Sequence, residues 1–234
     1  MNPYRNLKNT TFKIVKYLYF NFNLKYFFLF RKIYYLYYPK YRIYKIFHKL
    51  ISNKGLILDV GANNGESTNY FNDNFKCKII AFEPNFFLYN KLKKIFIKNK
   101  NILIINKALG KSNRIAKLYL HKDSFIKDTG FLSESASLNS KKNNLSKKIF
   151  VKIKMINLEH FLKKEKFINC IKINIEGYEY DLLPILIKYK HKIGSVVCAL
   201  HGGKKYPEFE CKKRFIYKLL KKKKLINKWF YEFR

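Results

Sequence analysis

Cysteines are few in this sequence of 234 residues, and none of them is spaced for a metal site. The four cysteines form no C-x-x-C pair, and three of them lie in or beside apolar runs: Cys77, Cys170, Cys198 and Cys211. Zinc sites and the disulfide frameworks of small secreted domains both depend on patterned cysteines. We therefore expect reduced thiols in a cytoplasmic protein, and no metal centre.

A long apolar run is also missing, most clearly in residues 1–54. No uncharged run in this segment exceeds eight residues, whereas a helix that spans a bilayer needs about 20 mostly apolar residues. A secretory signal likewise needs an uninterrupted apolar core. We expect neither a membrane-spanning helix nor a signal peptide.

Acidic residues are absent before Asp59, so the extension of residues 1–54 is basic and aromatic. Its twelve Lys or Arg and seventeen aromatic residues predict one or two helices, broken near residues 21–23, with the second ending at Pro39. Two interpretations stay open. Residues 1–45 could bind an anionic membrane, at its inner surface, through rings and ammonium groups. Alternatively, the helices pack on the domain that follows.

Acids are scarce along the whole chain. The sequence has 15 Asp and Glu against 50 Lys and Arg, which gives a formal net charge of +35. Such a charge usually indicates nucleic acid or an anionic membrane as partner. However, 44 of the basic residues are Lys, and the chain is crowded with residue types that A and T codons alone can encode. Base composition therefore explains much of the lysine, and the scarcity of Arg argues against nucleic acid.

The most informative pattern begins with two short apolar runs, Leu56–Val60 and Lys78–Phe82, which are typical of buried parallel strands. Gly61 and Gly65 follow the first run and let the backbone approach a ligand. Glu83 follows the second, where a carboxylate can accept hydrogen bonds from both hydroxyls of a ribose. Because ligands of open α/β sheets bind at the carboxyl ends of strands, we expect a nucleoside cofactor here.

The loop after the first run indicates which cofactor this is. A dinucleotide fingerprint needs small residues at positions that here hold Gly61, Asn63 and Glu66. The Glu66 carboxylate would repel a pyrophosphate at the helix start, and Asp59 adds a second acid that we expect to face the same crevice. Two acids without a phosphate clamp fit S-adenosyl-L-methionine, which carries an amino acid and a sulfonium instead of phosphates.

Four motifs follow one another along the chain: D-V-G-A-N-N-G-E at 59–66, F-E-P at 82–84, N-K-A-L-G at 106–110 and K-I-N-I-E-G-Y-E at 172–179. Together they resemble the FkbM-type methyltransferases, a class I family that uses S-adenosyl-L-methionine. The resemblance covers about residues 55–200 and implies a Rossmann-like α/β domain at 55–234. Such a domain has a mostly parallel sheet with helices on both faces.

The resemblance also implies a reaction and a cofactor site. The reaction is O-methylation, usually of a hydroxyl on a sugar or a polyketide, and in bacteria often within surface-glycan pathways. The expected cofactor residues are Asp59, Gly61, Ala62, Asn63, Gly65 and Glu83, with Asn106 at the adenine edge and Ala108 in the adenine slot.

The predicted strand Cys170–Ile175 brings candidate catalytic residues to the same edge. Alternation along it places Asn174 and Glu176 on one side. Glu176 is the first candidate for a base or for a group that orients the acceptor hydroxyl, and His201 is the second. The family usually has Asp in place of Asn174, and since Asn cannot take a proton, this departure weakens any two-carboxylate or Mg²⁺ mechanism.

Each catalytic candidate has a purely structural alternative. Glu176 could bind the cofactor's ammonium group or cap the next helix, and His201 could sit in a turn. Three neighbours are expected to form ordinary surface or helix pairs: Lys172, Glu179 and Asp181.

Helices and strands continue to alternate along the remaining chain. We expect helices at 86–98 and 208–224 and strands at 101–106, 115–120, 151–156 and 225–233, with Asn157 capping a short helix. The polar segment 121–150 is either an acceptor-binding loop or lid, or a disordered insertion. A complete class I sheet has seven strands, the last antiparallel, and the C-terminal end has room for one strand where two are needed. We expect a sheet shortened at that end.

Three functions stay open. The leading hypothesis is a cytoplasmic enzyme that methylates a hydroxyl of a glycan sugar or a related small molecule. A nucleic-acid methyltransferase is supported by charge, but the fourth core strand ends in N-I-E-G instead of an aromatic-Pro amide motif that holds a flipped base. A non-catalytic, membrane-associated relative is suggested by Asn174 and the basic N-terminus. The sequence specifies neither the acceptor nor the oligomeric state.

Overall fold

The computed structural model describes residues 39–52, 54–122, 136–138, 145–202 and 206–232. They belong to two units that we describe separately, one ending at Lys49 and one running from Leu50 to Phe233. In the first, helix α3 spans Pro39–Leu50. A helix thus begins at Pro39, because the fixed φ of proline suits a first helical turn, where no N–H is needed. The helices expected before it lie outside the described residues.

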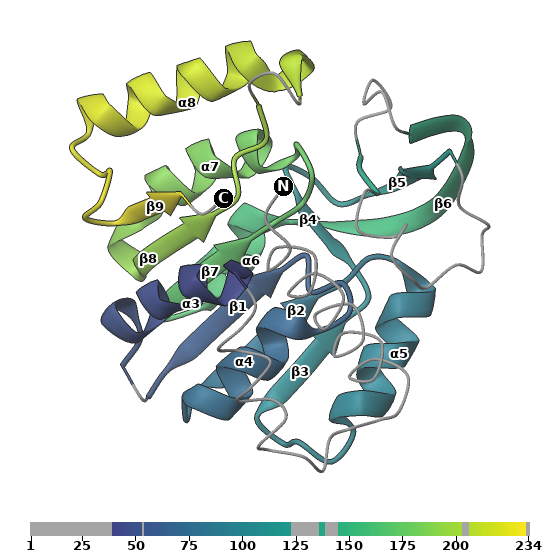
Figure 1. Cartoon of the computed structure of the whole chain (residues 1–234), viewed down its shortest axis with the longest axis horizontal. Helices are drawn as coiled ribbons and strands as arrows, with labels where there is room; N and C mark the ends of the chain where they lie inside the picture. Colours follow the sequence, from purple (N-terminus) through teal and green to yellow (C-terminus); the bar gives the residue numbers. More distant parts are fainter. Residues whose placement is uncertain (1–38, 53, 123–135, 139–144, 203–205, 233–234) are drawn as a thin grey trace, which may run out of the picture. The chain divides into compact units, whose positions relative to one another are not determined.

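Six strands form the central sheet of the second unit, and every neighbouring pair in this sheet is parallel. Across the sheet in Figure 1 they are β3 (Ile102–Ile105), β2 (Lys78–Phe82), β1 (Leu56–Val60), β7 (Ile168–Ile173), β8 (Ile193–Cys198) and β9 (Phe230–Glu232). The chain leaves β1 toward β2 and β3 on one side and returns to β7 on the other. Ligands of open α/β sheets bind at such a switch point, beyond the carboxyl ends of the strands.

Helices cover both faces of this sheet. They are α4 (Glu66–Asn74), α5 (Phe86–Phe96), α6 (Leu158–Lys164), α7 (Glu179–Lys188) and α8 (Glu210–Lys222). Neighbouring residues of a strand point to opposite faces. Phe82 accordingly belongs to the core with residues of α6, α7 and α8, whereas Ala81 packs with residues of α5. The expected Rossmann-like α/β fold is confirmed. None of the helices in the described ranges is long and apolar enough to cross a membrane.

The C-terminal end of the sheet is short, as expected. After the 3₁₀ helix η5 (Pro207–Phe209) and α8, the chain adds only β9, which pairs parallel to β8. The indole N–H of Trp229 donates to the carbonyl of Ile193 at 2.7 Å, which ties the approach to β9 onto the start of β8. The described residues contain no antiparallel seventh strand.

A second sheet of three strands was not expected from the sequence. It comprises β4 (Ala108–Gly110), β5 (Arg114–His121) and β6 (Leu145–Asn157), with β6 in the middle. The segment 121–150 is therefore not a single loop, since residues 145–150 belong to β6. Polar residues are tolerated there because one face of an antiparallel pair can meet water. Most of the remaining predicted insertion, residues 123–135 and 139–144, lies outside the described residues.

Candidate active site

Two glycines shape the loop between β1 and α4. The φ angles of Gly61 and Gly65 are 83° and 85°, in the left-handed region. A Cβ atom on Gly61 would lie 2.2 Å from the backbone oxygen of Asn174, so this loop touches the segment that follows β7. The N–H groups of Gly61 and Ala62 both donate to the carbonyl of Phe82 at 3.1 Å. The predicted loop residues thus lie together at the carboxyl ends of β1, β2 and β7.

Glu83 follows β2 and holds the same loop through its carboxylate. Its Oε2 accepts the N–H of Asn63 at 2.7 Å, and its Oε1 accepts the N–H of Asn85 at 2.9 Å. Burial raises the pKa of Glu83 to about 7, although the two backbone hydrogen bonds and the charge of Lys172 oppose the rise. Each carboxylate oxygen has a second acceptor position, so Glu83 can still bind two hydroxyl groups.

Asp59 points into the protein, which corrects the expectation of a second carboxylate facing the crevice. It is fully buried. Its Oδ1 accepts from Lys172 Nζ at 2.9 Å, while its Oδ2 accepts from the hydroxyls of Ser67 and Thr68 at 2.6 and 2.7 Å. Lys172 also donates to the Gly61 carbonyl at 3.0 Å, so it is a buried partner and not a surface residue. The two charges meet because Asp59 and Lys172 are register partners on β1 and β7.

The two residues predicted to contact adenine lie beside this loop. The side-chain amide of Asn106 donates to the carbonyls of Glu83 and Pro84, each at 3.0 Å. Asn106 therefore orders the backbone that carries Glu83. Ala108 begins β4, is buried, and packs in a small core with Met155 and its neighbours. A contact of either residue with adenine stays a prediction.

Three side chains gather beyond the ends of β7 and β8. The imidazole of His201 has its Nε2 3.3 Å from Glu176 Oε1 and its Nδ1 2.9 Å from Glu179 Oε1. The backbone N–H of His201 donates to the same Glu179 oxygen at 2.9 Å, and the N–H of Gly177 donates to the other oxygen at 2.8 Å. The two predicted catalytic candidates, Glu176 and His201, are thus brought together.

The two carboxylates beside His201 favour its protonated form. Burial lowers its pKa, but the hydrogen bonds and negative charges of Glu176 and Glu179 outweigh burial and raise the pKa to about 9. A protonated imidazole cannot accept another proton. Of the two candidate bases, the raised pKa of His201 therefore favours Glu176 as the base.

Sequence reasoning misplaced Glu179 and the direction of Glu176. Glu179 is fully buried instead of forming a surface pair. A usable signal was present, because a carboxylate in a first helical turn, three residues after another, readily accepts backbone N–H groups. Strand alternation does not place Glu176, since β7 ends at Ile173 and Glu176 has a left-handed φ of 54°. The turn, not the strand, directs it toward His201.

Two further expectations near this site hold. Asp181 pairs at the surface with Lys111, at 2.5 Å, and with Lys212, at 3.6 Å. Asn157 caps α6 by accepting the N–H of His160 at 3.1 Å.

Asn174 stands directly after β7, between the two halves of the site. Its N–H donates to the carbonyl of Val60 at 3.1 Å, while its side-chain Oδ1 is buried and has no hydrogen-bond partner among the described residues. An unpaired buried acceptor costs about 1–3 kcal/mol, which a ligand donor would offset. In the part of the chain that the structure describes, no three His, Cys, Asp or Glu side chains are grouped to hold a metal ion.

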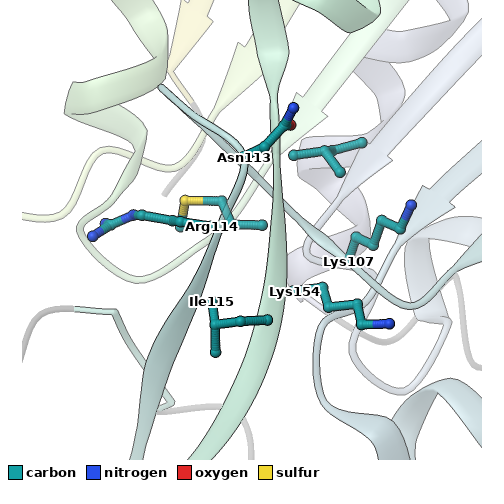
Figure 2. A pocket seen from close by; sticks show the side chains of 7 residues that line it. Lys107, Asn113, Arg114, Ile115 and Lys154 are labelled. Atoms are coloured by element: carbon teal, nitrogen blue, oxygen red, sulfur yellow. The ribbon is translucent and has the colours of Figure 1, made fainter.

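A surface pocket lies on the second sheet. Its lining consists of Lys107, Asn113, Arg114, Ile115, Lys154, Met155 and Ile156. In Figure 2 the side chain of Arg114 points away from those of Lys107 and Lys154, so the three cations do not converge on one point. None of the lining residues is a predicted site residue, and we do not assign the site to this pocket.

A comparison with models of protein families finds a match, and its range contains the glycine loop. The family model described as the methyltransferase FkbM domain matches residues 59–215. This range includes the glycine loop, Glu83 and the second sheet. It also includes the three side chains that gather beyond β7 and β8, which are Glu176, Glu179 and His201. No curated protein matches the chain significantly. Because the family model covers well over half of the 234 residues, the chain belongs to the FkbM methyltransferase family.

Proposed function

We propose that this protein transfers a methyl group from S-adenosyl-L-methionine to a hydroxyl oxygen on a sugar of a surface glycan or on a related small molecule. Membership of the FkbM family supports methyl transfer in general. The specific proposal rests on one contact, the approach of Gly61 to Asn174. It puts the glycine loop next to the turn that carries Glu176, so a donor on the loop and an acceptor at Glu176 share one edge of the sheet.

The residues on the loop side fit this donor. Glu83 keeps an acceptor position on each oxygen for the ribose hydroxyls, and Asn106 and Ala108 lie where we expect the adenine. The buried Oδ1 of Asn174, which lacks a partner among the described residues, would accept from the ammonium group. When bound, the donor supplies a methyl group that its sulfonium makes electrophilic.

On the acceptor side, Glu176 is the group that handles the proton. Its carboxylate would accept a hydrogen bond from the acceptor hydroxyl, align the oxygen for in-line attack, and take the proton as the methyl group moves. The His201 imidazole, with Nε2 3.3 Å from Glu176 Oε1, holds that carboxylate in place for this role.

Calorimetry with S-adenosyl-L-methionine tests the donor half of the proposal. We expect saturable binding by the full chain, and the same affinity for Glu176→Gln, which alters only the acceptor side. A titration without heat of binding at millimolar donor would overturn the enzyme assignment.

Transfer of a labelled methyl group tests the acceptor half. Over a panel of free and lipid-linked sugars, Glu176→Gln should lower kcat by about 10²–10⁴-fold, the usual contribution of a general base. Glu165→Gln, a matched change in the loop before β7, should leave kcat unaltered. Equal activity of the wild type and Glu176→Gln would contradict the role of Glu176.

The net charge of +35 favours nucleic acid as the alternative acceptor. Random duplex and single-stranded DNA and RNA therefore belong in the same panel. We expect weak binding that physiological salt abolishes, since lysine-phosphate contacts release counterions. Micromolar binding that survives this salt, together with methyl incorporation into nucleic acid, would replace the sugar proposal.

A further inference from the structure

The carboxylate of Glu179 accepts three hydrogen bonds within the candidate site. It accepts the N–H of Gly177 on Oε2, and both the N–H and the Nδ1 group of His201 on Oε1, all at 2.8–2.9 Å. Its side chain is fully buried. A carboxylate this deep is stabilised only by such partners, and all of them belong to the two segments that carry Glu176 and His201.

These bonds leave His201 a single orientation. With Nδ1–H held by Glu179, the opposite nitrogen, Nε2, faces Glu176 at 3.3 Å. The backbone on both sides is also tied down: the hydroxyl of Tyr180 donates to the His201 carbonyl, and the hydroxyl of Ser137 donates to the Glu176 carbonyl at 2.6 Å. Glu176 has a left-handed backbone with φ of 54°, a conformation that persists in a non-glycine residue only where surrounding contacts hold it.

Among the described residues, the acidic groups that raise the pKa of His201 are Glu176 and Glu179. Burial raises the pKa of Tyr180 far above its ordinary value, which keeps its hydroxyl neutral, and burial does the same for the Cys198 thiol. Glu232 is engaged by Lys213 at 2.9 Å, and Glu210 by Arg214 at 3.1 Å. The ring of Tyr206 also meets His201 edge to face.

We propose that Glu179 is a positioning residue for methyl transfer: it keeps His201 doubly protonated with Nε2–H directed at Glu176, and so presents the Glu176 carboxylate to the acceptor. Glu179 touches neither donor nor acceptor. Its role rests on the proposed function of Glu176, but the state of His201 can be measured without any acceptor.

Nuclear magnetic resonance of the imidazole nitrogens tests the first part. The chain has five histidines, and His201→Asn identifies the His201 signals. In the wild type we expect both ring nitrogens of His201 to be protonated at pH 8. In Glu179→Gln, one of the two negative charges that oppose the effect of burial on the His201 pKa is gone. The titration midpoint of the His201 imidazole should therefore fall by at least about one pH unit. Asp181→Asn, in the same helical turn, is the matched control and should not move it.

Kinetics with an identified acceptor test the second part. In Glu179→Gln, kcat should fall and the alkaline limb of its pH profile should move to lower pH, while donor affinity measured by calorimetry changes less than about twofold. Glu179→Asp, which keeps the charge, should restore part of kcat and of the profile. A purely structural role would change stability and leave the profile in place.

Two results would overturn the proposal. One is a neutral His201 ring at pH 8 in the wild type, which decides the matter even if Glu179→Gln does not fold. The other is an unchanged His201 midpoint in folded Glu179→Gln. Failure of the proposed function is seen separately, as absent donor binding or absent transfer by the wild type.

Discussion

Single buried charges govern both halves of the candidate site. Glu83 and Glu179 are carboxylates that accept backbone N–H groups, yet their settings differ. Glu179 lies against the imidazole of His201. Glu83 instead accepts from two backbone N–H groups among the described residues, and burial raises its pKa to about 7. The ionised form of Glu83 is therefore maintained only in the upper part of the physiological pH range.

This property predicts that donor binding depends on pH. In the folded chain the pKa of Glu83 is raised to about 7. Protonation of Glu83 therefore stabilises the folded chain at low pH, and this stabilisation is lost as pH rises through 7. Ribose hydroxyls need the ionised acceptor, so affinity for S-adenosyl-L-methionine should increase about tenfold from pH 6 to pH 8. Calorimetry at both values measures it. Glu83→Gln should bind weakly with little pH dependence, and equal wild-type affinities would refute the assignment.

At the scale of elements, the Asp59–Lys172 pair joins β1, β7 and the start of α4. Removing the cation alone leaves a buried carboxylate with only hydroxyl partners. Lys172→Met should therefore lower the free energy of unfolding by about 3–5 kcal/mol. The double variant Asp59→Asn/Lys172→Met should lose less than the sum of the two single variants. Denaturant unfolding measures this, and additive losses would mean that the two side chains do not interact.

The glycine loop depends on the absence of a side chain at one point. Gly61→Ala places a Cβ 2.2 Å from the backbone oxygen of Asn174 at a φ of 83°. The conformation alone costs about 1–3 kcal/mol, and the clash displaces the contact between the loop and the turn after β7. We expect lower stability and weakened donor binding. Gly202→Ala meets chiefly the flexible side chain of Lys213 and should change neither; similar losses in both variants would contradict the special role of Gly61.

At the scale of the whole molecule, the charge is distributed unevenly between the extension and the domain. Residues 1–45 contain ten Lys or Arg and no Asp or Glu. We propose a peripheral association of this segment with anionic membranes, through aromatic rings and lysines at headgroup depth.

Deletion of residues 1–45 tests that association. The full chain should sediment with vesicles containing a third phosphatidylglycerol and remain in solution with neutral phosphatidylcholine vesicles. The deletion variant should lose the binding to anionic vesicles and keep donor affinity. Undiminished vesicle binding after deletion would assign the interaction to the basic domain surface instead.

Local sequence patterns determined the glycine loop of this protein and its fold class. Apolar runs, glycines and an acid after the second run are close together in sequence. Their spacing was enough to predict β1, the loop, α4, β2 and Glu83, because each depends on local backbone preference and on the sidedness of a parallel sheet. The motifs at 59–66 and 172–179 likewise indicated the FkbM family that the match over residues 59–215 shows.

The tertiary structure alone decided which charged residues are buried and with which partners. Asp59 and Lys172 are 113 positions apart and meet only because β7 pairs with β1. His201 reaches Glu176 and Glu179 because β8 lies beside β7. The second sheet, too, arises from pairing between distant segments. The periodicity and spacing of residues indicate which local segments form strands and helices. The partner of a buried charge depends on the order of the strands in the sheet, and no local pattern contains that order.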